Sequence, residues 1–130
     1  NGTKHPVIHK MDYQKELIKS KQFGGTIMLG AWPLKIKKGT RLEKIYNKNL
    51  VLDERHRHRY EFNNKYREVF EKSDMKLVGK SSDGLLVEAV ELSQKVHPFF
   101  VGTQYNPELK SRFLEPHPLF MGFINACLKK

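Results

Sequence analysis

The segment Asn106-Pro107-Glu108 carries two polar side chains that suit proton chemistry or ligand binding. It follows the apolar run 99–105, which predicts a strand. In open α/β sheets, loops at the carboxyl ends of strands form the active site. A glutamate can orient a neighbouring base, whereas an asparagine amide hydrogen-bonds but cannot act as a general base near pH 7. The segment indicates either a ligand site or an ordinary turn started by Asn-Pro.

A second candidate is the run Glu-Arg-His-Arg-His-Arg-Tyr-Glu-Phe-Asn at 54–63. Strand alternation would separate its arginines, on one face, from its histidines, on the other. These are Arg55, Arg57 and Arg59, and His56 and His58. Neighbouring arginines repel one another unless an anion lies beside them, and a planar guanidinium is a bidentate clamp for a substrate carboxylate.

Several alternatives to a substrate carboxylate remain for this arginine row. Asp53, Glu54 and Glu61 are near enough in sequence to neutralise it from within the chain. A phosphate or nucleic-acid patch, and a metal site at His56 and His58, are less favoured. A third motif, Gly24-Gly25-Thr26, predicts a flexible or tightly turned loop, and taken alone it favours a plain turn.

The elements that must position these residues alternate strands with a few helices. We expect strands within 5–9, 26–37 (one or two strands, bent at Pro33), 50–62, 76–79, 85–92 and 99–105. A turn at 81–84 predicts a hairpin, Thr40 caps a short helix, and Asn63 or Asn64 caps another that runs to about Lys72. A C-terminal helix at 118–129 has an apolar face of Phe120, Phe123, Ile124 and Leu128. So many strands need more helices than these, which favours a preceding segment that completes the fold.

Composition excludes several classes of protein. The chain has 130 residues, enough for one domain at 1–130, and a net charge of +10 from lysines scattered along the sequence, which favours solvated faces over a nucleic-acid site. No apolar run approaches the about 18 residues of a membrane span. One cysteine, Cys127, excludes an internal disulfide framework and fits a reducing cytoplasmic setting; we expect a buried or semi-buried helix thiol. Six histidines without cysteine partners predict no structural metal site.

Taken together and in order, these motifs resemble the CTP synthase family. Its members carry a Gly-Gly-Thr-Met-Arg-Leu-Gly loop, Glu-Arg-His-Arg-His-Arg, Val-Glu-x-x-Glu-Leu, His-Pro-x-Phe with a following His-Pro-Glu, and a helix containing Pro-Leu-Phe. This chain has near matches at 24–30, 54–63, 87–92, 97–108 and 118–120. The resemblance covers nearly all of the chain. It implies an α/β fold, namely the C-terminal part of a class I glutamine-amidotransferase-like (flavodoxin-like) three-layer domain with a mixed sheet.

The resemblance also implies roles for individual residues. In such a glutaminase domain a cysteine attacks the amide of glutamine, a histidine carries the proton and a glutamate orients the histidine. Glu108 matches the glutamate, Arg59 matches the arginine that holds glutamine, and the loop at Gly24, Gly25 and Thr26 matches the lid that answers the effector GTP. The ammonia then aminates UTP, activated by ATP with Mg²⁺, in a separate synthetase domain through which the parent assembles as a homotetramer.

The chain departs from the family pattern at three points. Asn106 occupies the position of the histidine, Met28 replaces the arginine of the lid, and Cys127 lacks the Gly-x-Cys-x-Gly context of the nucleophile. The nucleophile is therefore expected upstream of Asn1. We expect the chain by itself to be inactive, and the alternative is a catalytically dead domain with a regulatory or assembly role.

Overall fold

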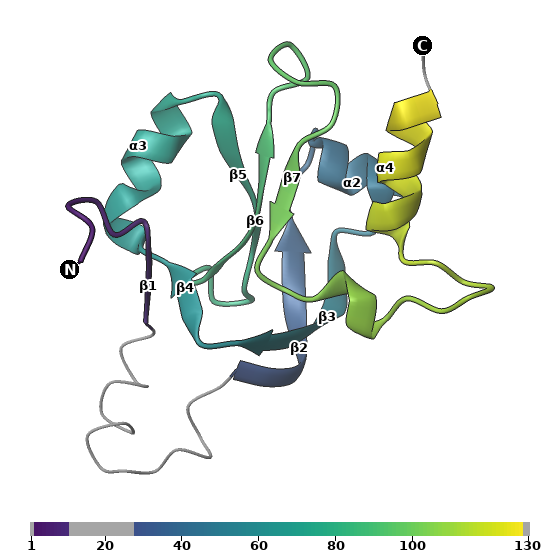
Figure 1. Cartoon of the computed structure of the whole chain (residues 1–130), viewed down its shortest axis with the longest axis horizontal. Helices are drawn as coiled ribbons and strands as arrows, with labels where there is room; N and C mark the ends of the chain where they lie inside the picture. The colour runs from purple at the N-terminus through teal and green to yellow at the C-terminus, as the bar shows by residue number, and fades with distance from the viewer. Residues whose placement is uncertain (1, 11–27, 129–130) are drawn as a thin grey trace.

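A five-stranded sheet forms the centre of the molecule in the computed structural model, which describes residues 2–10 and 28–128 (Figure 1). Its strand order is β3-β2-β5-β6-β7, and every pair of neighbours in this described part is antiparallel. The strands are β2 (Met28–Ile36), β3 (Val51–His58), β5 (Met75–Lys80), β6 (Val87–Leu92) and β7 (Val101–Thr103). A separate antiparallel pair joins β1 (Ile8–Lys10) to β4 (Tyr60–Phe62).

Helices lie on two sides of this sheet. In Figure 1, α3 lies on one side, and α2 and α4 lie together on the other. The α-helices are α2 (Arg41–Ile45), α3 (Arg67–Lys72) and α4 (Pro118–Leu128), with 3-10 turns η2 (Asn64–Tyr66) and η3 (Pro107–Leu109). The predicted α/β class is confirmed. The mixed sheet that the resemblance implies refers to the whole domain, whereas the strands described here pair only in antiparallel fashion.

Local sequence signals predicted most element ends. The Thr40 side chain accepts a hydrogen bond from the Glu43 amide and caps α2, and Asn63 caps η2 through Lys65. The predicted hairpin forms from β5 and β6, with Gly84 at φ 76° in its turn. Strand β2 passes through Pro33 without a break. At Pro33, β2 pairs with β3 along one edge only. On its other edge, β2 pairs with β5 only through Lys35 and Ile36. The missing amide hydrogen of Pro33 therefore removes no hydrogen bond to β5.

The chain leaves the sheet edge sooner than the sequence predicts. Strand β7 covers three residues rather than the expected 99–105. Thr103 still pairs with Ala89 of β6, and the Gln104 amide still bonds to the Glu88 carbonyl at 2.8 Å. The Asn106 amide then bonds to the Arg55 carbonyl of β3 at 2.8 Å. The backbone therefore crosses from β6 to β3, and this crossing brings the two polar motifs together.

The core is packed from both sheet and helices. Its buried members are Leu34, Ile36, Leu42, Tyr46, Val78, Ala89, Tyr105 and Leu119.

In the described part of the chain, no helix has the length and apolar character needed to span a bilayer.

Helix α4 buries Leu119, a residue outside the predicted apolar face, most deeply, although Phe123 of that face packs edge-on against Phe99 at 5.6 Å between ring centroids. Leu119 is buried and Gly122 lies against Ile45, whereas Phe123 and Ile124 are both 50% exposed. Cys127 is also exposed, so the expectation of a buried or semi-buried thiol is wrong. Helix positions three or four apart share one face, so Leu119, Gly122 and Ala126 face the protein. Cys127 is one position beyond Ala126 and therefore points away from that face.

Candidate glutamine-site remnant

Asn106 and Glu108 form a hydrogen-bonded pair at the start of η3. Asn106 Nδ2 donates to Glu108 Oε1 at 2.8 Å. Pro107 between them starts the 3-10 turn, so that residues two apart in sequence turn their side chains toward each other. Glu108 is exposed and Asn106 is half-buried. The predicted site residues at this strand end are therefore in contact.

Strand β3 anchors Asn106 from the other side. The Arg57 amide donates to Asn106 Oδ1 at 3.0 Å, and the Asn106 amide donates to the Arg55 carbonyl. The side-chain amide is thus held between a backbone donor and a carboxylate acceptor, which sets its orientation. It can hold a polar group in place but has no proton to exchange near neutral pH.

The alternation predicted for the arginine and histidine run is confirmed in β3. Arg55 and Arg57 are exposed, His56 is buried and His58 is half-buried. Arg59 follows the last residue of β3 and is exposed, at the bend before β4. The structure therefore brings Asn106 and Glu108 together beside Arg57, two residues before Arg59.

Of the residues assigned to the lid, the structure describes Met28 but not the glycine loop. Gly24, Gly25 and Thr26 lie outside the described residues. Met28 begins β2, where it is buried and pairs with His58. Within the described ranges, no group of three His, Cys, Asp or Glu side chains could hold a metal ion.

Glu54 does not face the arginine row, which corrects one of the alternatives considered above. It has the same parity as His56 in β3, so its side chain points into the protein and is 0% exposed. Its Oε1 accepts hydrogen bonds from the Tyr46 hydroxyl at 2.8 Å and from His117 Nε2 at 3.0 Å. Lys110 Nζ lies 3.7 Å from the same oxygen and donates to the Asp53 carbonyl at 2.6 Å.

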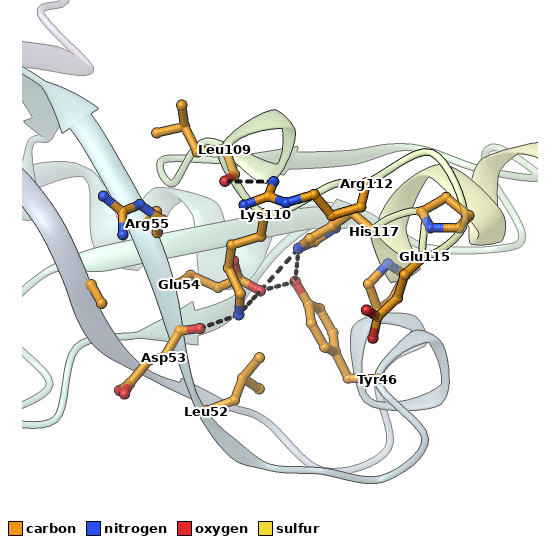
Figure 2. A pocket seen from close by; sticks show the side chains of 13 residues that line it. Tyr46, Leu52, Asp53, Glu54, Arg55, Leu109, Lys110, Arg112, Glu115 and His117 are labelled. Atoms are coloured by element: carbon orange, nitrogen blue, oxygen red, sulfur yellow. Dashed lines mark hydrogen bonds and ion pairs between the residues drawn. The ribbon is translucent and has the colours of Figure 1, made fainter.

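This cluster borders a cavity of about 1040 Å³ between β3 and the segment that leads to α4 (Figure 2). Figure 2 shows Tyr46, Lys110 and His117 converging on Glu54 from three separate segments. Burial alone raises the pKa of Glu54, but the hydrogen bonds from His117 and Tyr46 outweigh it and hold that pKa below its ordinary value. Burial raises the pKa of Tyr46, so its hydroxyl stays a donor.

The sequence reasoning missed this cluster, although a signal for it was present. The alternation that buries His56 also buries Glu54, and a buried carboxylate requires partners. Lys110 belongs to the same loop as Asn106 and Glu108, so its contact with β3 secures the loop that carries them.

The chain matches a protein family over most of its length. Residues 11–126 match the family model of glutamine amidotransferase class-I. Among curated relatives, the CTP synthase of Nocardia farcinica is 52% identical over 98% of this chain. The CTP synthase of Rubrobacter xylanophilus is 51% identical over 97%. The chain spans about a fifth of the length of these relatives (22% of each).

A solved structure agrees with these sequence matches. The glutaminase domain of Trypanosoma brucei CTPS with bound acivicin superposes with a TM-score of 0.82 at 32% identity. The match covers 98% of this chain and 47% of that one. The predicted fold and the resemblance are therefore confirmed. The chain belongs to the class I glutamine amidotransferase family, and within it matches the glutaminase domain of the CTP synthases.

Proposed function

We propose that this chain is the part of a CTP synthase glutaminase domain that holds glutamine, within a longer protein that makes CTP from UTP, ATP and ammonia. The matches to CTP synthases over nearly the whole chain support this. ATP and Mg²⁺ would bind in the synthetase part of the parent, which would act as a cytoplasmic homotetramer. A purely regulatory or assembly role is not favoured, because the chain is about half identical to CTP synthases over nearly its whole length.

Within this proposal, Arg59 receives the carboxylate of glutamine and Glu108 orients the residue at position 106. The guanidinium is exposed and suits bidentate binding of a carboxylate. The relative from Trypanosoma brucei carries acivicin in its glutaminase domain, which supports a ligand site in the same domain here.

The observation that carries the proposal is the contact between Asn106 and Glu108. At 2.8 Å the glutamate is in place to orient a proton carrier, but the side chain that it orients is an amide. The proton of a nucleophile upstream would have no acceptor at this position. We propose that the parent releases ammonia from glutamine poorly and makes CTP chiefly from free ammonia.

The lid and its effector are a further part of the proposal. GTP would act through the loop at Gly24, Gly25 and Thr26, and the response would be weak because Met28 lacks the guanidinium that the family has there.

The test uses the full-length protein that carries this chain. Ammonia release from glutamine is compared between the natural protein, the Asn106→His variant and a variant whose nucleophilic cysteine is replaced. We expect the natural protein to match the cysteine variant and N106H to exceed both, with ammonia-dependent CTP synthesis equal in all three. Glutamine hydrolysis by the natural protein well above the cysteine variant would overturn the proposal.

A further inference from the structure

The side chains of His58, His56 and Glu88 form a line beneath the arginine row, on the opposite face of β3, which runs from half-buried His58 to buried Glu88 of β6. His58 Nδ1 lies 2.8 Å from the Tyr60 carbonyl oxygen, and His56 Nδ1 lies 2.9 Å from His58 Nε2. His56 Nε2 lies 3.6 Å from Glu88 Oε2 of β6. The side chains of His56 and Glu88 are 1% and 2% exposed. This line contains neither Asn106 nor Glu108.

The Tyr60 carbonyl, at the end of the line, fixes which atom donates in each contact. The Tyr60 carbonyl can only accept, so His58 Nδ1 carries a hydrogen. With His58 neutral, its Nε2 is an acceptor, so His56 Nδ1 carries the next hydrogen. His56 Nε2 is then a lone pair, and it faces the carboxyl group of Glu88.

Glu88 Oε2 lies just beyond hydrogen-bond distance of His56 Nε2, and only a proton on Glu88 would let these two groups form the last bond of the line. A carboxylate beside an imidazole lone pair offers no donor, and Glu88 Oε2 has no hydrogen-bond partner among the described residues. Burial, then the charges of Glu61 and Asp83, raise the pKa of Glu88 to about 7. The Tyr105 hydroxyl adds no charge, because burial keeps its pKa well above neutrality.

Burial favours the neutral form of both histidines. Burial, then the charge of His58, lowers the pKa of His56 to about 4, although Glu54 on the same strand opposes this. Burial lowers the pKa of His58 as well, against the opposing effect of its bond to Tyr60. Below about pH 7, where Glu88 keeps its proton, two neutral imidazoles and one protonated carboxyl group allow a single hydrogen-bond direction along the line.

The line ends at the backbone bend that presents Arg59. Strand β3 ends at His58 and β4 begins at Tyr60, in a different sheet. The bond from the His58 ring to the Tyr60 carbonyl thus spans Arg59 and ties the two strands together across it. Any rotation of the His58 ring would release this bond, and His56 prevents that rotation from the other side.

We propose that Glu88, His56 and His58 are positioning residues that hold the bend at Arg59, so that its guanidinium faces the substrate carboxylate. The second half of this statement rests on the proposed function of Arg59 in glutamine binding. The first half concerns the backbone alone and can be tested without substrate.

Two substitutions of Glu88 separate hydrogen bonding from packing. Glu88→Gln puts an amide N–H where a carboxyl proton would donate to His56 Nε2. Glu88→Leu fills similar space with no donor. His58→Phe keeps a ring but removes the bond to Tyr60. His117→Phe is the matched control, because His117 is a buried histidine that contacts β3 through Glu54, outside the line.

The experiment measures backbone amide exchange at 58–62 and glutamine affinity by calorimetry, both in the full-length protein. We expect E88L and H58F to accelerate exchange at 58–62 about tenfold and to weaken glutamine binding about tenfold, the loss of one hydrogen bond. E88Q should stay within about twofold in both. H117F should leave exchange at 58–62 unchanged.

Each outcome bears on one half of the proposal. Unchanged exchange at 58–62 in both E88L and H58F would overturn the positioning role. Faster exchange with unaltered glutamine affinity would overturn its link to substrate. If the natural protein and an Arg59→Ala variant fail equally to bind glutamine, the proposed function falls, and the exchange data still decide whether the line holds the bend.

Discussion

The amide of Asn106 is held at both ends, with Nδ2 2.8 Å from Glu108 Oε1 and Oδ1 3.0 Å from the Arg57 amide. Its donor faces an acceptor and its acceptor faces a donor, so asparagine fits this place without strain. Under the proposed function, Glu108 thus orients an amide at the place where the family has its proton carrier. Stability and catalysis therefore depend on this position in different ways, and variants can separate them.

Restoring histidine at position 106 should introduce a pH dependence that the natural protein lacks. With an ordinary imidazole, glutamine hydrolysis by the N106H full-length protein should rise as pH increases through about 6.5, and exceed that of the natural protein by about a hundredfold or more. Initial rates of ammonia release between pH 5.5 and 8 measure this. A flat profile in N106H would show that another group limits the reaction.

Removing the hydroxyl of Tyr46 should destabilise the protein through Glu54. The hydroxyl donates to a fully buried carboxylate at 2.8 Å, so Tyr46→Phe should lower the free energy of unfolding by about 1–3 kcal/mol. Tyr60→Phe is the matched control, since Tyr60 is 49% exposed, and it should change the value by less than about 0.5 kcal/mol. Denaturant unfolding of the full-length protein provides the comparison. Equal effects of the two substitutions would argue against a structural role for the Glu54 cluster.

Glu88 should make stability fall as pH rises. Its pKa is about 7 in the folded protein against 4.5 ordinarily, so the folded state binds the proton more tightly. The contribution is complete below pH 4.5 and is lost as pH rises through 7, a change of about 3 kcal/mol.

The Glu88→Gln variant separates this contribution from that of His56, which has the opposite sign. His56 is buried in its neutral form, so it lowers the free energy of unfolding at low pH, where the unfolded state binds a proton more readily. The difference in unfolding free energy between natural and E88Q proteins should shift against the natural protein between pH 4.5 and 8. Thermal unfolding across this range measures the difference. A constant offset would mean that Glu88 is ionised throughout.

Gly79 in β5 has no room for a side chain. A Cβ there would lie 2.8 Å from Ala89 Cβ and 2.9 Å from Leu34 Cδ1, at a register shift between β5 and β6. Gly79→Ala should therefore destabilise the protein by about 1–3 kcal/mol through overpacking. Gly2→Ala is the control, because no atom lies within 4 Å of its Cβ position. Thermal unfolding of both variants should show a lower midpoint for G79A alone.

The sequence by itself determined the features that depend on near neighbours. Strand alternation placed the arginines and histidines of 55–58 on opposite faces, because side chains in an extended chain point to alternate sides. The caps at Thr40 and Asn63 followed from side-chain oxygens that reach amides two or three residues ahead. The proposed lack of a proton carrier at position 106 depends on residue identity alone.

Only the tertiary structure decided which distant groups meet. Alternation buries Glu54, but its bond to His117 spans 63 residues and depends on how the segment after η3 returns over β3. Asn106 meets Arg57, 49 residues earlier in the chain, because the segment after β7 stops pairing with β6 and turns toward β3. Likewise, the exposure of Cys127 depends on which face of α4 packs against α2. No local pattern specifies such contacts, since they depend on the path of the backbone between strands.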